Sequence, residues 1–252
     1  MSHFPLAKRT RFGCAFFVVL PMALATALPA WSAGAACAAQ SGPQRTPVVE
    51  LYTSEGCSSC PPADQWLSTL KGTPVVAQAF HVGYWDYIGW VDRFATSAYT
   101  ARQREWAQIN QLSNIYTPQL VRDGHDWPDW RRARLVSTGV PAAASITVQR
   151  VGQSDQFTAR VSPNDTHGTW SAYWTVTEHG HASRVQAGEN RGEFLQHDFV
   201  VRQYTPVGRY QGPQTLTFVS IPAQPDHPRQ INLVVHDPRT GEPLQAVSLT
   251  CT

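Results

Sequence analysis

The sequence has 252 residues, of which 42% are hydrophobic and 15% are charged, with a formal net charge of +2. This composition supplies enough apolar side chains for a folded core and excludes a disordered chain. A nearly neutral chain without a basic stripe gives no reason to expect a nucleic-acid partner. The nine Trp and nineteen Pro residues indicate β-rich and loop-rich structure rather than a helical bundle.

The N-terminus has the pattern of a secretory signal peptide. Basic residues at 8–11 precede a mostly apolar stretch over 12–28, and small residues with signal-peptidase spacing follow. An uncleaved membrane anchor is the alternative, but Pro21 interrupts the run, which is short for a span of ~20 apolar residues. We therefore expect residues 1–36 to be removed, leaving an exported periplasmic or secreted protein without a stable membrane span.

Five cysteines are distributed unevenly in the chain. Cys14 lies in the signal peptide, and Cys37 lies at its expected boundary and is expected to leave with it. Cys57 and Cys60 are two residues apart, which indicates a redox pair or a metal pair. Cys251 is expected to be a bystander, or to pair with Cys37 if cleavage retains that residue.

After a flexible lead-in at residues 37–46, the chain alternates strand and helix patterns. The expected elements are strand 48–53, helix 61–70, strand 75–82, helix 97–111 capped by Ser97, strand 119–121, a turn at 123–124 and helix 126–136. Strands that alternate with helices predict an α/β domain over residues 47–139.

The pattern changes near residue 140. Short β-branched or alternating runs follow without helices, at 146–150, 157–161, 170–177, 199–204, 215–221 and 231–235. Several short strands separated by turns predict a β-rich, sandwich-like domain over residues 140–252.

The Cys57-Ser58-Ser59-Cys60 motif lies between a strand and a Pro-Pro helix start. Free N–H groups and the helix dipole lower the pKa of a cysteine at such a position. We expect Cys57 to be an exposed nucleophile and Cys60 to resolve the mixed disulfide that it forms. A structural disulfide and half of a zinc site are the alternatives, although no second ligand pair is evident for zinc.

Residues 48–138 resemble the thioredoxin superfamily and, more closely, the exported bacterial family catalogued as domain of unknown function 1223 (DUF1223). The resemblance implies a thioredoxin-like fold and export, and it brings no established activity. Two departures from the family pattern matter. Gly83 stands where an acidic residue is expected after His81-Val82, which puts a role of that loop in metal or substrate binding in doubt. The segment after Gly124 is short, which weakens the expected fourth strand at the sheet edge. The matching stretches are 49–54 (VELYTS), 56–64 (GCSSCPPAD), 80–82 (FHV), 84–87 (YWDY), 89–90 (GW), Asp92, Phe94, 100–103 (TARQ) and 116–119 (YTPQ).

In a thioredoxin-type fold, Thr117-Pro118 corresponds to a cis-proline turn beside the dithiol, where the Thr117 backbone meets a substrate. An ordinary trans proline at a strand start is the alternative. The same fold keeps a buried acid near the resolving thiol, and Glu50 is the candidate for that general-base role. A Glu50 side chain that faces solvent is equally compatible with the sequence.

His81 at a strand end is a further candidate. It would perturb Cys57, or bind copper together with Cys57 and Cys60, since thiolate and imidazole suit that metal. A hydrogen-bonded structural histidine is the commoner case. The aromatic stretch that follows, with Trp85, Asp86, Trp90 and Asp92, either lines a peptide groove or only packs.

These observations predict a thiol–disulfide oxidoreductase with Cys57, Cys60, Thr117, Pro118 and Glu50 at its site. Its expected partners are protein or small-molecule thiols and disulfides, and no cofactor is expected. The alternatives are a binding module with a structural disulfide, and a copper-handling protein.

Overall fold

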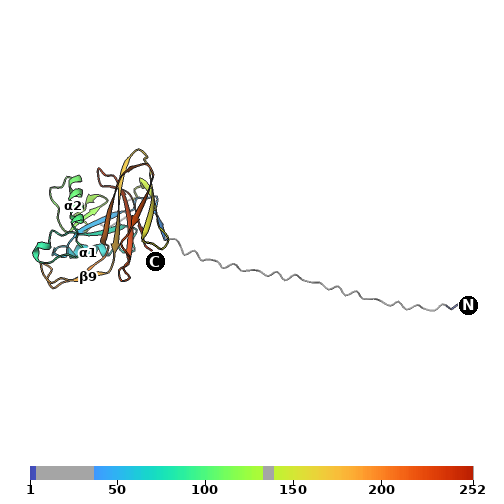
Figure 1. Cartoon of the computed structure of the whole chain (residues 1–252), viewed down its shortest axis with the longest axis horizontal. Coiled ribbons are helices and arrows are strands. Elements are labelled where there is room, and N and C mark those ends of the chain that lie inside the picture. Colours follow the sequence, from blue (N-terminus) through green and yellow to red (C-terminus); the bar gives the residue numbers. More distant parts are fainter. Residues whose placement is uncertain (4–36, 133–138, 252) are drawn as a thin grey trace. The chain divides into compact units, whose positions relative to one another are not determined.

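The computed structural model describes residues 1–3, 37–132 and 139–251. The described residues from 37 onward belong to one compact unit, shown in Figure 1. The predicted signal peptide falls almost wholly outside the described residues, as does the second half of the helix predicted over 126–136.

The larger sheet contains strands from both halves of the sequence. β2 and β3 are parallel, β11 joins the free edge of β3 in parallel at Ala79 and Val200, and the other neighbours are antiparallel. In spatial order the strands are β14 (Pro243–Leu249), β13 (Arg229–His236), β8 (Thr169–Glu178), β11 (Val200–Gln211), β3 (Val76–His81), β2 (Val48–Thr53), β4 (Gln119–Arg122) and β5 (His125–Asp126).

A second sheet has four antiparallel strands, and a separate hairpin pairs β9 (His181–Arg184) with β10 (Phe194–His197). The predicted flexible lead-in at 37–46 is wrong in part, because β1 lies within it and pairs with β6. The strands of this sheet in spatial order are β1 (Ala38–Gln40), β6 (Ala144–Arg150), β7 (Gln156–Pro163) and β12 (Gln214–Val219).

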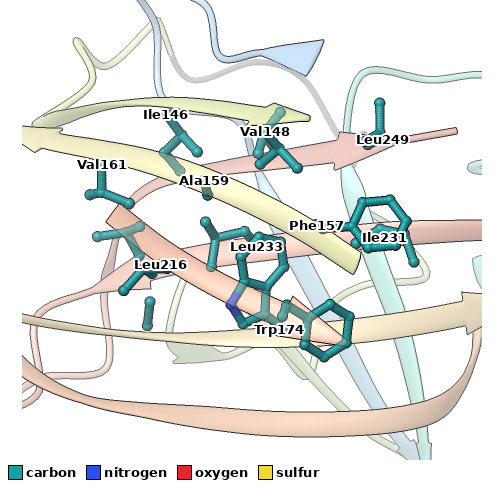
Figure 2. Close-up of a cluster of buried hydrophobic side chains, with 14 of the residues drawn as sticks. Ile146, Val148, Phe157, Ala159, Val161, Trp174, Leu216, Ile231, Leu233 and Leu249 are labelled. Atoms are coloured by element: carbon teal, nitrogen blue, oxygen red, sulfur yellow. The ribbon is translucent and has the colours of Figure 1, made fainter. Parts of the chain in front are cut away.

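A large apolar cluster lies between the four-stranded sheet and the β8, β13 and β14 part of the larger one (Figure 2). In β6 the alternation is strict: Ile146 and Val148 are fully buried, whereas Thr147 and Gln149 face solvent. A two-residue side-chain period explains this pattern, because successive side chains of a strand point to opposite faces. Trp174 of β8 stacks on Phe218 of β12 across the cluster.

Two α-helices occur within the described residues: α1 (Pro61–Ser68) and α2 (Ser97–Ile109). Pro61 and Pro62 suit the first turn of α1, where an N–H would have no partner in the helix. Ala63 and Leu67 bury the inner face of α1 in a cluster with side chains of β2 and β3. In the described part of the chain, neither helix has both the length and the apolar character that crossing a membrane requires.

The start of α2 corrects one detail of the sequence interpretation. Its N-cap is Thr96 and not Ser97, and the Thr96 hydroxyl accepts from the Tyr99 N–H at 3.4 Å. The predicted turn is confirmed, since Asp123 and Gly124 both have positive φ and connect β4 to β5.

The predicted fold class, an α/β thioredoxin-like domain followed by a separate sandwich-like domain, is wrong. The described chain is mostly β-sheet with two α-helices, and residues 128–132 form turns where a third helix was expected. Strands from beyond residue 140 continue the sheet that β2 and β3 begin (Figure 1). The expected domain boundary is absent because β11 pairs with the edge of β3. The backbone groups of that edge would otherwise remain exposed.

Candidate functional site

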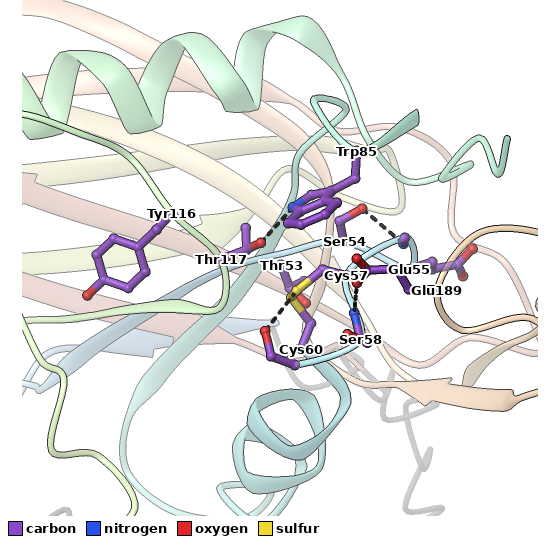
Figure 3. The surroundings of a disulfide bond; sticks show 12 residues. Thr53, Ser54, Glu55, Cys57, Ser58, Cys60, Trp85, Tyr116, Thr117 and Glu189 are labelled. Carbon is purple, nitrogen blue, oxygen red and sulfur yellow. Dashed lines mark hydrogen bonds between the residues drawn. A yellow bond between two sulfur atoms is a disulfide. The ribbon is translucent and has the colours of Figure 1, made fainter. Parts of the chain in front are cut away.

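The Cys57–Cys60 pair lies in the turn that connects β2 to α1, and it is closed as a disulfide with Cα atoms 5.4 Å apart (Figure 3). Cys57 is 1% exposed and Cys60 is 0% exposed, whereas Ser58 and Ser59 between them are exposed. The expectation of an exposed Cys57 sulfur is therefore wrong. Access to the disulfide requires some movement of the surrounding chain.

The start of α1 offers fewer free donors than the sequence suggested. Pro61 and Pro62 have no N–H, and the N–H groups of Ala63 and Asp64 both donate to the Cys60 carbonyl, at 2.9 and 3.2 Å. The first helical N–H groups are thus not available to a Cys57 thiolate. Any stabilisation of that thiolate has to come from the surrounding side chains or from the weaker field of the short helix.

One side of the disulfide turn is held by residues 185–193 between β9 and β10, here called the covering loop. Asn190 Nδ2 donates to the carbonyls of Glu55 and Cys57, at 2.9 and 3.0 Å. The Ser58 N–H donates to Glu189 Oε2 at 3.0 Å, and this bond lowers the pKa of the Glu189 carboxyl group. Asn190 is buried, whereas Glu189 is exposed. The covering loop therefore fixes the backbone of the turn through three hydrogen bonds.

Another side of the turn faces Trp85 of the aromatic stretch, and Thr117 of the proline loop lies nearby (Figure 3). The predicted cis bond between Thr117 and Pro118 is confirmed. Trp85 Nε1 donates to the Thr117 hydroxyl at 2.7 Å, and both side chains lie among the surroundings of the disulfide in Figure 3. A Cβ added to Gly56 would lie 3.0 Å from Trp85 Cβ, so any larger residue at 56 would have to displace the indole. The structure thus brings Trp85 to the cysteine turn and Thr117 to Trp85.

Trp90 and Asp92, two other residues of the predicted peptide groove, face inward. Trp90 Nε1 donates to Glu55 Oε2 at 2.7 Å, and Asp92 Oδ2 accepts from the Glu55 N–H at 2.9 Å. Asp86 Oδ1 accepts from the Asp92 N–H at 3.2 Å. Through these contacts Trp90 and Asp92 of the aromatic stretch pack around Glu55.

Glu50 is buried, but its partners lie away from the cysteines. Its carboxylate accepts from Arg102 Nη2 at 2.5 Å, from the Tyr173 hydroxyl at 2.5 Å and from the Tyr52 hydroxyl at 3.0 Å. Burial acts to lower the pKa of Arg102, but the charge of Glu50, together with the nearby Tyr52, Tyr173 and Tyr204, holds that pKa well above its usual value. Glu50 therefore serves as the anion of a buried ion pair, and neither cysteine is among its hydrogen-bond partners.

Beside the disulfide turn lies a buried group of carboxylates and imidazoles, here called the carboxylate–histidine cluster: Glu55, Asp64, His81, Asp92 and His197. Each of these residues is at most 5% exposed. His81 Nδ1 lies 2.7 Å from Asp92 Oδ2. His197 Nε2 lies 3.3 Å from Glu55 Oε1, and its Nδ1 lies 3.7 Å from Asp64 Oδ1.

The charges of the cluster shift the protonation of its members. Burial acts to lower the pKa of His197, but Asp64 and Glu55 outweigh it and raise that pKa to about 10. Burial acts to raise the pKa of Asp92, but His81 and the N–H groups of Glu55 and Phe94 together lower it. In the metal-free protein, His197 is thus an imidazolium between two carboxylates at neutral pH.

The copper set predicted from Cys57, Cys60 and His81 does not form in this structure. The two sulfurs are bonded to each other, and His81 faces Asp92 and the His197 ring. Sequence reasoning missed Asp64 and His197 as candidates. Asp64 stands in the cysteine motif itself, four residues after Cys60, whereas His197 carries no spacing signal.

Comparisons with known proteins agree with this architecture. Among solved structures, the chain is similar to protein AGR_C_4864 from Agrobacterium tumefaciens, with 23% identity, a TM-score of 0.60, and coverage of 82% of this chain and 95% of that one. It is also similar to HBP35 of Porphyromonas gingivalis, with 12% identity, a TM-score of 0.56, and coverage of 82% and 76%. No curated protein matches the sequence. The model of the family described as "Protein of unknown function (DUF1223)" matches residues 48–236, and the chain therefore belongs to that family.

Proposed function

We propose that the protein acts outside the cytoplasm as a thiol–disulfide exchange protein whose Cys57–Cys60 disulfide is reached when the covering loop moves. Two disulfides are present, and disulfides persist in oxidising compartments, which supports export. The observation that carries the proposal is that only a short loop, residues 185–193, holds the backbone of the disulfide turn on one side. Three hydrogen bonds from Glu189 and Asn190 hold the turn, while Ser58 and Ser59 are already exposed.

The energy of such an opening is modest. A hydrogen bond contributes about 0.5–1.5 kcal/mol net, and up to about 3 kcal/mol when one partner is charged. Releasing three of them costs a few kcal/mol, which is less than the roughly 5–15 kcal/mol of global unfolding. Local opening is therefore a far more frequent route to the sulfurs than unfolding.

In the oxidising direction the chemistry needs a partner dithiol. One partner thiolate attacks the sulfur of Cys57, the Cys57–Cys60 bond breaks, and the Cys60 sulfur leaves with the electron pair and takes a proton. The second partner thiolate then attacks the partner sulfur of the mixed disulfide and releases Cys57 as a thiolate. Two electrons pass to the protein, and the partner gains one disulfide.

A structural disulfide in a binding module is the second candidate. The observations that favour it are the burial of both sulfurs and the use of the first helical N–H groups by the Cys60 carbonyl. In that case the reduction potential of the pair lies below about −300 mV, the range of structural disulfides. Equilibration of Cys57 and Cys60 with a glutathione buffer separates the two candidates.

A trapping experiment tests the exchange reaction. We expect the Cys60→Ser variant to accumulate a mixed disulfide with a peptide that carries a single thiol, with oxidised glutathione as the oxidant, because neither the protein nor the peptide then holds a second thiol that could resolve it. The matched Cys57→Ser variant should trap far less, since its remaining thiol belongs to Cys60, the N-cap of α1, whose backbone bonds to the helix are not released when the covering loop opens. Mass spectrometry of the quenched adducts gives the yield. Equal and negligible trapping by both variants would contradict exchange at Cys57.

The covering loop makes a second prediction. Replacing Asn190 with Ala removes two hydrogen bonds to the turn, which lowers the cost of opening by about 1–3 kcal/mol. The reduction of Cys57–Cys60 by dithiothreitol should therefore be roughly 5- to 150-fold faster than in the wild type. The measurement is the rate of alkylation of each cysteine pair under native conditions.

Two controls accompany this variant. Asn164→Ala removes a single bond from an exposed Asn to the Ala142 carbonyl and should leave the rate unchanged. The Cys37–Cys251 disulfide in the same molecule reports any general loss of stability. A wild-type rate for Asn190→Ala, or equal acceleration of both disulfides, would show that the covering loop does not control access.

A further inference from the structure

Three buried side chains from separate elements converge beside the disulfide turn. Asp64 comes from α1, His81 ends β3, and His197 ends β10. One ligand atom from each lies within 4.8 Å of the others, and the residues are 5%, 0% and 2% exposed. We infer that Asp64, His81 and His197 bind one divalent transition-metal ion, with Zn²⁺ the best match to their chemistry.

The ligand atoms have no hydrogen-bond partner in the described structure. They are Asp64 Oδ1, His81 Nε2 and His197 Nδ1, and each is inaccessible to solvent. A buried polar atom without a partner costs about 1–3 kcal/mol, and buried polar atoms are nearly always satisfied. Three such atoms directed toward one another are explained together by a cation that accepts all three lone pairs.

The second partners of these residues match those of known metal sites. His81 uses Nδ1 for Asp92 Oδ2 at 2.7 Å, which leaves Nε2 as the free lone pair. A histidine that binds a metal almost always gives its other ring nitrogen to a carboxylate or carbonyl, as His81 does here. Asp64 is oriented in the same way, because its Oδ2 accepts from the Thr53 hydroxyl at 2.9 Å.

His197 also has a carboxylate beside each ring nitrogen, although its Nε2 is within ion-pair distance of Glu55 and not hydrogen-bonded to it. Its Nε2 lies 3.3 Å from Glu55 Oε1, and its Nδ1 lies 3.7 Å from Asp64 Oδ1. Each of the three ligands therefore has one atom directed at the common point and another atom beside an orienting group. A histidine buried only for packing would not need one carboxylate beside Nε2 and another beside Nδ1, as His197 has in Glu55 and Asp64.

The spacing and the charge fit zinc. Ligand atoms about 2.1 Å from a tetrahedral ion are about 3.4 Å apart, so the 3.7 Å between Asp64 and His197 is already close. Two imidazoles and one carboxylate form a known zinc ligand set that keeps a fourth position for water. The cluster also buries the carboxylates of Glu55, Asp64 and Asp92, and a divalent cation would compensate their charge.

This site goes beyond the proposed disulfide exchange and does not use either cysteine. It also differs from the cluster without metal, in which a protonated His197 lies between Asp64 and Glu55. The metal site and the metal-free cluster are distinguishable, because only the metal site binds one ion per chain and requires the free Nε2 of His81.

Zinc binding by the chelator-treated full chain tests the inference. Isothermal titration with ZnCl₂, followed by metal analysis after gel filtration, should give one Zn²⁺ per chain for the wild type. Asp64→Asn and His81→Gln should lose stoichiometric binding. Asp92→Asn, which removes only the charge behind His81, should weaken binding about 10- to 100-fold. His125→Gln, at an exposed histidine paired with Glu242, is the matched control and should bind as the wild type does.

Cobalt substitution of the wild type keeps the test decisive if the buried variants do not fold. Co²⁺ should give the visible absorption of a four-coordinate site with nitrogen and oxygen ligands and no thiolate-to-cobalt charge-transfer band. The Cys57→Ser/Cys60→Ser variant should give the same spectrum. Absence of stoichiometric zinc in the wild type, a thiolate band, or zinc retained by both Asp64→Asn and His81→Gln would each overturn the assignment.

Discussion

Replacing both Cys37 and Cys251 with Ala should lower the free energy of unfolding by about 5 kcal/mol. The disulfide joins residues 214 positions apart, and a closed loop of that length reduces the entropy of the unfolded chain by an amount worth about 5 kcal/mol at 25 °C in the chain-entropy model. Both cysteines also pack against the large apolar cluster. The bond ties the segment that carries β1 to the chain end after β14, so its loss frees an edge of the four-stranded sheet.

Urea denaturation of the oxidised proteins measures this effect. The matched control is Cys57→Ala/Cys60→Ala, which opens a loop between residues only three positions apart and should cost about 2 kcal/mol in the same model. The difference between the two double variants therefore reports loop length rather than the loss of a sulfur bond as such. Equal losses would mean that strain or residual structure in the unfolded state, and not loop entropy, sets the contribution of these bonds.

Local sequence patterns predicted several elements in the first half of the chain, but not the fold class. The runs at 48–53 and 75–82 form β2 and β3, and the Pro-Pro start and apolar spacing after Cys60 form α1. These elements depend on neighbours within a few residues, which is the range that side-chain periodicity reports. What periodicity does not report is which strand occupies a free sheet edge. The pairing of β11 with β3 connects Val200 to Ala79, and it converts an expected separate domain into one mostly β unit.

The candidate site also combines residues that a local motif marks with residues from distant parts of the chain. Cys57, Cys60 and the cis Thr117-Pro118 bond were predictable, because a short motif or a proline marks each of them. The covering loop and His197 come from more than 120 residues later and have no motif, so only the folded chain shows that they reach the disulfide turn. The predicted exposure of Cys57 was wrong for this reason, since what buries a residue is supplied from elsewhere in the chain.

Glu50 gives the second prediction with a large effect on stability. Its carboxylate pairs with Arg102, and the two side chains are only 7% and 13% exposed. Removing one partner of a buried pair leaves the other charge uncompensated and costs about 3–5 kcal/mol. Glu50→Gln preserves shape and can still accept hydrogen bonds, so a loss of this size would report the missing charge. The Arg102 guanidinium also lies 4.1 Å from the centre of the Tyr173 ring, and the variant keeps this contact because Glu50→Gln changes neither residue.

A double-mutant cycle in urea separates charge from packing. Glu50→Gln/Arg102→Met removes both charges from the buried site and should recover much of the stability lost by Glu50→Gln alone, because no unpaired charge remains.

The control pair is Lys71 and Asp198, 2.8 Å apart, where the Lys71 side chain is 55% exposed. Lys71→Gln should cost at most about 1 kcal/mol, because solvent screens an exposed ion pair. If Glu50→Gln costs no more than Lys71→Gln, water reaches the Arg102 side chain and the pair is not a buried one. A full loss that persists in the double variant would instead assign the stabilisation to the hydrogen bonds from Tyr52 and Tyr173.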